Sequence, residues 1–275
     1  MDAEHRLVFV GGLHRSGTTP LAAALAKHPL ISGLRDTGVP HDEGQHLQPV
    51  YPKAKVYAGS GHFAFAPAAH LTESSPLVSA ENAQRLVSAW APYWDLSKPI
   101  LVEKSPPNLI MGRFLQELFP DAVLVVVVRH PVVVALCNKK WRRLASRNIR
   151  RYSTLTQLVE HWVHAHRILL EDASHLRNLV VVRYEDLVDC PGRELGRIQE
   201  RLGLDEPIPG EGLRGDHSGP YERMWQEMAR GWGPAAAQRR RIVRRFADDV
   251  AAFGYDVEDL GYRSALPAEL RVPVG

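Results

Sequence analysis

Residues 12–19, GLHRSGTT, are the part of the sequence best suited to bind an anion. The glycines in this stretch allow a tight turn and a close approach of the backbone to a ligand. Arg15 lies inside the turn and offers a planar donor fork that suits the oxygens of a phosphate or a sulfate. The backbone amides that we expect to point at the anion are those of Ser16, Gly17, Thr18 and Thr19.

This turn lacks the lysine of a loop that binds nucleoside triphosphates. The spacing of Gly12 and Gly17 matches the pattern G-x-x-x-x-G-K-[ST], but Thr18 stands where the lysine would hold the β- and γ-phosphates. The sequence therefore favours a phosphorylated ligand that is not a triphosphate.

Two further cationic side chains follow segments with the character of strands. Lys104 comes after the apolar residues 100–102, and Arg129 comes directly after the β-branched run 122–128. Residues at the carboxyl ends of parallel strands line the ligand crevice of an open sheet. We therefore expect Lys104 and Arg129 to lie near the turn at residues 12–19.

Together, these motifs resemble those of the sulfotransferases that use 3′-phosphoadenosine 5′-phosphosulfate (PAPS). HRSGTT is similar to the 5′-phosphosulfate loop of that family, PRSGTT, with His14 in place of the proline. EKSP at residues 103–106 matches the family pattern [DE]-K-[ST]-P, and VVVVRHP resembles the segment that binds the 3′-phosphate. The resemblance covers residues 7 to about 202. Within the family, the chain resembles the bacterial members and, more distantly, the tyrosylprotein sulfotransferases.

The resemblance implies a role for each cation. The turn with Arg15 would bind the 5′-phosphosulfate, and Arg129 would bind the 3′-phosphate. Lys104 would stabilise the charge that gathers on the bridging oxygen during in-line transfer, which lowers the barrier more than it strengthens ground-state binding. The donor would be PAPS, the product would be adenosine 3′,5′-bisphosphate (PAP), and no metal is expected.

The acceptor hydroxyl or phenol must lose a proton as it attacks, so a general base is expected in the polar segment at residues 35–51. Glu43 precedes Gly-Gln as a glutamate does in related chains, which makes it the candidate base. His41, Asp42 and His46 remain alternatives.

Two more nucleotide contacts are implied by the resemblance. The family usually has a serine eight residues after the arginine, but this chain has Cys137 there, with Asn138 or a backbone amide as a substitute donor. Tyr184, in RYEDL, stands where the family has a tyrosine that touches the nucleotide.

Predicted strands and helices alternate along the chain, which indicates an α/β fold. We expect a three-layer sandwich with a mainly parallel central sheet, a P-loop-like nucleotide-binding fold. We expect one domain over residues 1–275, in which residues 30–60 form a long substrate loop and residues 215–265 a helical segment. Strands are predicted at residues 7–10, 100–102, 122–128 and 179–183, and helices at 81–94, 106–118, 131–144, 155–170 and 191–202.

Composition limits the partners and the location. The 34 basic and 31 acidic residues of the 275 are too balanced to indicate a nucleic-acid partner. Two cysteines give neither a disulfide framework nor a zinc site. With no export signal and no apolar segment long enough to span a bilayer, we expect a cytoplasmic, bacterial protein without a stable membrane anchor.

No motif in the sequence identifies the acceptor. Members of the resembled family in bacteria act on glycans, lipids and secondary metabolites, so a small-molecule, lipid or glycan acceptor is expected, and the oligomeric state stays open. Two other functions are alternatives: an ATP-dependent kinase of a small molecule on the same fold, and a nucleotide-binding module without catalysis.

Overall fold

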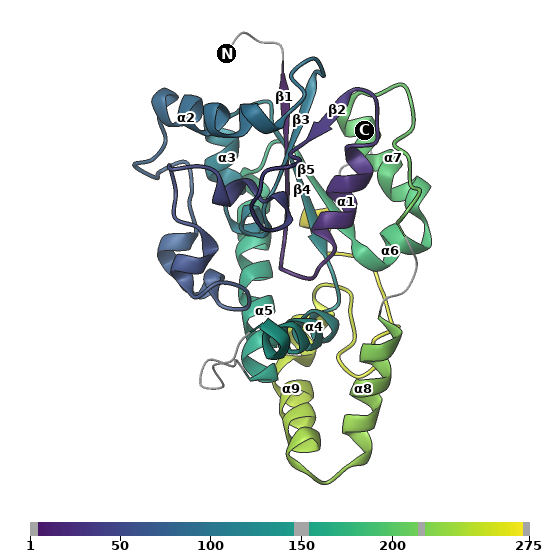
Figure 1. Cartoon of the computed structure of the whole chain (residues 1–275). Helices are drawn as coiled ribbons and strands as arrows, with labels where there is room; N and C mark the ends of the chain where they lie inside the picture. Colours follow the sequence, from purple (N-terminus) through teal and green to yellow (C-terminus); the bar gives the residue numbers. More distant parts are fainter. Residues whose placement is uncertain (1–4, 146–153, 214–217, 272–275) are drawn as a thin grey trace.

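The computed structural model describes residues 5–145, 154–213 and 218–271, and for residues 140–145 it describes the backbone. A parallel sheet of five strands forms the centre of this part of the chain (Figure 1), with the strand order β2-β3-β1-β4-β5. The strands are β1 (Arg6–Gly12), β2 (Ile31–Gly33), β3 (Ile100–Lys104), β4 (Val123–Val128) and β5 (Leu179–Arg183).

The register of the sheet brings the functional segments to one edge. Val10 of β1 pairs with Lys104 of β3, and Gly12 of β1 pairs with Val127 of β4. The three strands therefore end side by side. The turn that follows β1, the side chain of Lys104 and the residue after β4, Arg129, all emerge at this carboxyl edge.

Helices cover both faces of the sheet because successive side chains of each buried strand point to opposite sides. Val8 and Val10 pack in one apolar core with the helices α1 (Thr18–Leu25), α6 (Tyr184–Asp189) and α7 (Pro191–Leu202). Leu7 and Phe9 pack in the other with α2 (Ala80–Trp90), α3 (Gly112–Leu118) and α5 (Leu155–Asp172). The predicted three-layer sandwich with a parallel sheet is confirmed.

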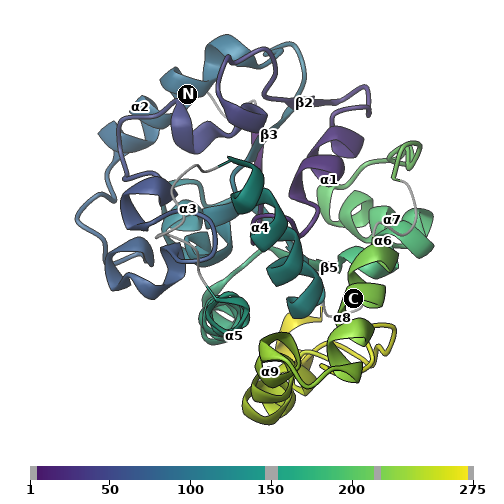
Figure 2. The same ribbon diagram turned by 60° about the horizontal axis from the view of Figure 1, so that its bottom comes forward.

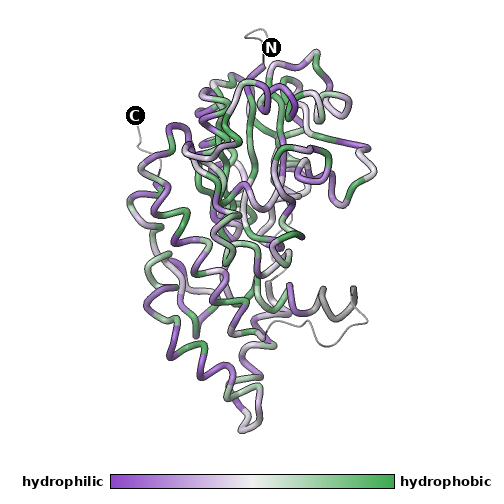
Figure 3. Tube along the Cα trace, turned by 90° about the vertical axis from the view of Figure 1, so that its left-hand side faces the viewer, coloured by the Kyte–Doolittle hydropathy of each residue, from purple (hydrophilic) through white to green (hydrophobic). Residues whose placement is uncertain are grey.

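Three more helices lie beyond the carboxyl edge. Figure 2, in which this edge comes forward, shows α4 (Pro131–Ala145) near the centre, with α8 (Gly219–Arg230) and α9 (Pro234–Ala251) below it. Helices α8 and α9 form a hairpin along which hydrophilic and hydrophobic residues alternate (Figure 3). No helix in the described ranges has both the length and the apolar character needed to cross a bilayer.

The strand and helix at residues 179–183 and 191–202 have the predicted bounds, but other segments differ. The segment expected to be a loop contains β2, whose three residues are too few to show an alternating pattern. The helix predicted from residue 106 is a 3₁₀ turn, Pro106–Ile110, followed by α3. The helix predicted at 81–94 ends at Trp90, before Pro92. Residues 214–217 of the expected helical segment lie outside the described part.

Candidate active site

The turn after β1 begins α1 with an unusual backbone. Gly17 caps the helix with a φ of 105°, and a side chain at this position would overlap the ring of Tyr184. Arg15 also has a positive φ, 77°. Such backbone angles are rare for residues other than glycine, which is consistent with a turn shaped for binding.

Ser16 lies differently from our expectation. Its amide and its hydroxyl both donate hydrogen bonds to the carbonyl of Leu13, at 3.0 and 2.7 Å, so they close the turn instead of facing an anion. The amides of Gly17, Thr18 and Thr19 stand at the start of α1, where a helix offers no acceptor of its own.

Arg129 connects the end of β4 to this turn. Its Nη1 donates to the carbonyl of Arg15 at 3.0 Å, and its Nη2 donates to Ser218 Oγ at 3.0 Å. The guanidinium carbon lies 4.1 Å from the centre of the Tyr184 ring. Among the described residues, Nε of Arg129 has no hydrogen-bond partner although it is buried. One guanidinium therefore holds the turn and also contacts Ser218 and Tyr184.

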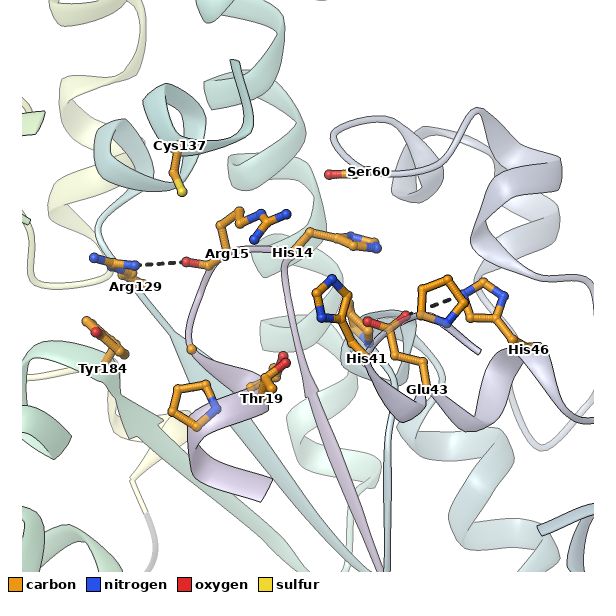
Figure 4. Close-up of a pocket in the computed structure, with 15 residues that line it drawn as sticks. His14, Arg15, Thr19, His41, Glu43, His46, Ser60, Arg129, Cys137 and Tyr184 are labelled. Carbon is orange, nitrogen blue, oxygen red and sulfur yellow. Dashed lines mark hydrogen bonds and ion pairs between the residues drawn. The ribbon is translucent and has the colours of Figure 1, made fainter. Parts of the chain in front are cut away.

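A cavity of about 450 Å³ opens beside the turn (Figure 4). Eight of the ten predicted site residues line it: Arg15, Gly17, Thr18, Thr19, Glu43, Arg129, Cys137 and Tyr184. Ser16 and Lys104 do not. Seven other residues complete the walls: His14, Pro20, Pro40, His41, His46, Ser60 and Pro106.

Lys104 lies directly behind Glu43. The Lys104 ammonium donates to the carbonyl of His41 at 2.8 Å and lies 3.3 Å from Glu43 Oε1. The other carboxylate oxygen of Glu43 accepts a hydrogen bond of 2.6 Å from Gln45. The predicted catalytic lysine thus contacts the predicted base. It does not line this cavity but a smaller one, which also includes Thr19 and His41.

The alternatives to Glu43 differ in their access to the cavity. Asp42 does not line it, because its carboxylate accepts hydrogen bonds from the amide and the hydroxyl of Thr37, at 3.0 and 2.6 Å. His41 and His46 do line it. His46 Nε2 lies 3.6 Å from Glu43 Oε2. Burial lowers the pKa of His46, although the negative charge of Glu43 acts to raise it.

The sequence of the chain matches a known protein family. A model of the sulfotransferase family matches residues 8–207, well over half of the chain and all of the segments that line the cavity. The chain belongs to the sulfotransferase family.

Two relatives show how close the similarity is. A protein-tyrosine sulfotransferase of Drosophila melanogaster is 25% identical over 210 residues, which are 74% of this chain and 39% of that protein. The chain thus spans about two fifths of the length of this relative. A solved sulfotransferase structure from Alicyclobacillus acidocaldarius has a TM-score of 0.50 and 14% identity, over 87% of this chain and 95% of that one. This second likeness concerns the fold, which is the P-loop-like fold expected from the sequence.

In this member of the sulfotransferase family, Glu103 positions the segment that carries Glu43. The buried carboxylate of Glu103 accepts hydrogen bonds from the Gly44 amide at 2.9 Å, the Ser105 hydroxyl at 2.6 Å and the Asn108 amide at 2.6 Å. The indole of Trp90 donates to the Gly44 carbonyl at 3.0 Å. Both polar groups of the Gly44 backbone are therefore fixed beside the predicted base.

Burial also changes the acidity of Glu103. Removal from water raises the pKa of Glu103 to about 7, and the hydrogen bonds from Ser105 and Asn108 and the charge of Lys104 oppose this effect only in part. In the sequence, Glu103 stands out only as a part of the EKSP motif. Its one sequence signal is an acid at the end of an apolar strand.

Cys137 and Asn138 have different surroundings. The Cys137 thiol lines the cavity and lies near the Tyr221 side chain. Burial, together with the neighbouring Cys137 thiol, raises the pKa of Tyr221 to about 12. Asn138 donates to the His14 carbonyl at 3.1 Å and accepts from the Ser60 hydroxyl, so it braces two segments of the wall. No motif in the sequence points to Tyr221 or Ser60.

Proposed function

We propose that the protein transfers a sulfuryl group from PAPS to the hydroxyl or phenol of a small-molecule, lipid or glycan acceptor. The observation that carries this proposal is the shared cavity of Arg15, Arg129 and Glu43, with Lys104 in contact with Glu43. Membership of the sulfotransferase family supports the reaction type. The absence of a lysine after Gly17 agrees with a donor that is not a triphosphate.

The two ends of PAPS would be held by two different cations. The 5′-phosphosulfate would bind Arg15 and the amides at the start of α1, where the helix dipole favours negative charge. The 3′-phosphate would bind Arg129, whose Nε has no hydrogen-bond partner in the described part of the chain. Tyr184, stacked on Arg129, and Cys137 would complete the nucleotide site.

Transfer would proceed in line. The acceptor oxygen forms a bond to sulfur while the bond from sulfur to the bridging oxygen breaks, and that electron pair goes to the 5′-phosphate of the leaving PAP. Glu43 takes the proton of the acceptor. Lys104 stabilises the negative charge on the bridging oxygen.

The contact between Lys104 and Glu43 would link these two steps. As Glu43 gains a proton it becomes neutral, and its attraction for the ammonium of Lys104 falls. Negative charge grows on the bridging oxygen in the same step, so the ammonium is drawn from Glu43 and the His41 carbonyl toward the leaving group. The proton transfer thereby releases the cation where it is needed.

Ligand binding and turnover together test this function. PAP should raise the melting temperature, and ATP with magnesium should not, because only a bound ligand stabilises the fold. With PAPS and a panel of phenols, alcohols and sugars, release of PAP should depend on the acceptor. Glu43→Gln should keep PAP binding and lose transfer.

Two outcomes would contradict the proposal. Stabilisation by ATP with magnesium, greater than that by PAP, would indicate a kinase. Binding of PAPS without transfer to any acceptor in the panel would indicate a nucleotide-binding module.

A further inference from the structure

The turn of the α8–α9 hairpin carries the most exposed large hydrophobic side chain in the described part of the protein. Trp232 is 96% exposed and stands between Gly231 and Gly233. The other tryptophans whose side chains are described are buried: Trp90, Trp94, Trp162 and Trp225. Exposing a whole indole ring to water costs free energy, which is recovered when the ring moves into apolar surroundings.

Positive charge gathers on α9, the helix that follows this tryptophan. Residues 228–247 contain six arginines and no acidic residue, although basic and acidic residues nearly balance in the chain as a whole. Of the six arginines, Arg230 precedes Trp232 by two residues and the other five follow it by seven to thirteen, whereas the exposed Glu227 precedes it by five. Arg239 pairs with Glu258, and Arg245 pairs with Glu160. The other four are exposed, and no ion pair joins them to any described residue: Arg230, Arg240, Arg241 and Arg244.

The hairpin extends from the end of the molecule where the cavity lies. Figure 1 shows α8 and α9 reaching past the edge at which β1 turns into α1. At the base of α8, Ser218 accepts the hydrogen bond from Arg129, and Tyr221 lies near Cys137 of the cavity wall. A surface that holds the tip of the hairpin would therefore face the same end of the molecule as the cavity.

We propose that the tip of the α8–α9 hairpin docks reversibly on an anionic lipid surface. Trp232 enters the layer between headgroups and acyl chains, where an indole places its apolar ring and its N–H in suitable surroundings. The four exposed arginines bind the lipid phosphates and contribute through their charge near the surface. This inference stands apart from the proposed reaction, because it concerns residues outside the cavity.

The shape of the tip favours a lipid surface over an acidic protein. Around Trp232 lie glycine, proline and alanine residues at 231 and 233–237, which offer little area for a complementary protein interface. A bilayer needs no matching shape and accepts a single protruding indole.

The test is sedimentation of the full chain with vesicles. Wild type should bind vesicles of phosphatidylcholine mixed with phosphatidylglycerol and should bind pure phosphatidylcholine vesicles far less, with affinity falling as salt rises. Arg240→Glu/Arg241→Glu should bind roughly tenfold more weakly or worse. Trp232→Ala should also bind more weakly. Brominated acyl chains should quench wild-type fluorescence on binding but leave that of Trp232→Phe unchanged.

Matched variants control for charge and hydrophobicity elsewhere. Arg35→Glu/Arg177→Glu makes the same change of net charge, and Leu96→Ala removes another exposed apolar side chain, one 48% exposed. Both should bind vesicles like wild type. The proposal is overturned if wild type does not distinguish the two vesicle types, or if both hairpin variants bind normally. Equal binding to poly-glutamate, independent of Trp232, would overturn it in favour of an acidic protein partner.

Discussion

The ammonium of Lys104 lies 3.3 Å from a carboxylate oxygen of Glu43, and the two side chains are 6% and 8% exposed. A buried ion pair of this kind contributes little net stability, but removing one partner leaves an uncompensated charge away from water. The two side chains that we propose as leaving-group cation and base therefore matter for stability as well as for the proposed catalysis. Substitutions can separate the two effects.

Lys104→Ala should lower kcat by roughly 10²–10³-fold, the usual cost of losing one donor that stabilises charge in a transition state. It should also lower the free energy of unfolding by roughly 3–5 kcal/mol, because Glu43 is left buried and unpaired. PAPS turnover and urea unfolding measure these changes. Lys104→Met/Glu43→Gln should regain stability but not turnover. Lys98→Ala is the control, since Lys98 also donates to a carbonyl, that of Ile31 at 3.0 Å. Unchanged turnover in Lys104→Ala would exclude the proposed role.

Gly44→Ala should impair catalysis without impairing nucleotide binding. A Cβ at Gly44 would lie 2.6 Å from Glu103 Oε1 and 2.8 Å from Trp90 Nε1, so the segment that carries Glu43 must shift. We expect a fall in kcat, an unchanged Kd for PAP and a loss of roughly 1–3 kcal/mol of stability. In Gly196→Ala, the added Cβ meets no atom within 4 Å, so this variant should keep full activity. Equal kcat for the two variants would show that the Gly44 contacts do not position the base.

Stability should fall as the pH rises through neutrality because of Glu103. Its carboxyl has a pKa of about 7 in the folded protein against an ordinary value of 4.5. Between these values the folded state keeps a proton that the unfolded state has released, so stability declines with pH, by roughly 3 kcal/mol in total. Glu103→Gln has no such proton.

The difference in unfolding free energy between wild type and Glu103→Gln isolates this effect. Urea unfolding at several pH values from about 5 to about 8 should show the difference shifting against the wild type up to about pH 7 and levelling off above it. Burial lowers the pKa of His130 and of His166 to about 4, but these groups act equally in both proteins. A difference that stays constant over this range would contradict the prediction.

Arg129→Lys should weaken PAP binding by roughly 10–100-fold, because a single ammonium cannot hold the Arg15 carbonyl and also pair with a phosphate as a planar fork does. Calorimetric titration with PAP measures the loss. Arg177→Lys, a change at a side chain 59% exposed, should bind PAP like wild type. If Arg129→Lys also binds normally, the 3′-phosphate lies elsewhere.

How far the sequence could predict the site depends on the range of the interactions. Some features of the fold have local signals in the sequence: the β-branched run of β4, the glycines of the turn and the proline at the start of α7. The parallel sheet and the phosphate loop could therefore be predicted. The family motifs then placed Arg15, Arg129 and Glu43 in one site, and the structure brings these three around one cavity. The edge strand β2 was not predicted, because three residues are too few to show an alternation of apolar and polar side chains.

Only the tertiary structure decided which partner each polar group takes. Lys104 was expected to face the ligand, but the path of residues 40–44 places Glu43 and the His41 carbonyl in front of its ammonium. Glu103 became the support of Gly44 through the same path, across 59 positions of sequence. A buried donor must find an acceptor wherever the chain supplies one, and no local pattern encodes which distant segment will supply it. The sequence by itself therefore determined the elements and their chemistry, and the packing of remote segments determined the order of side chains from the core to the cavity.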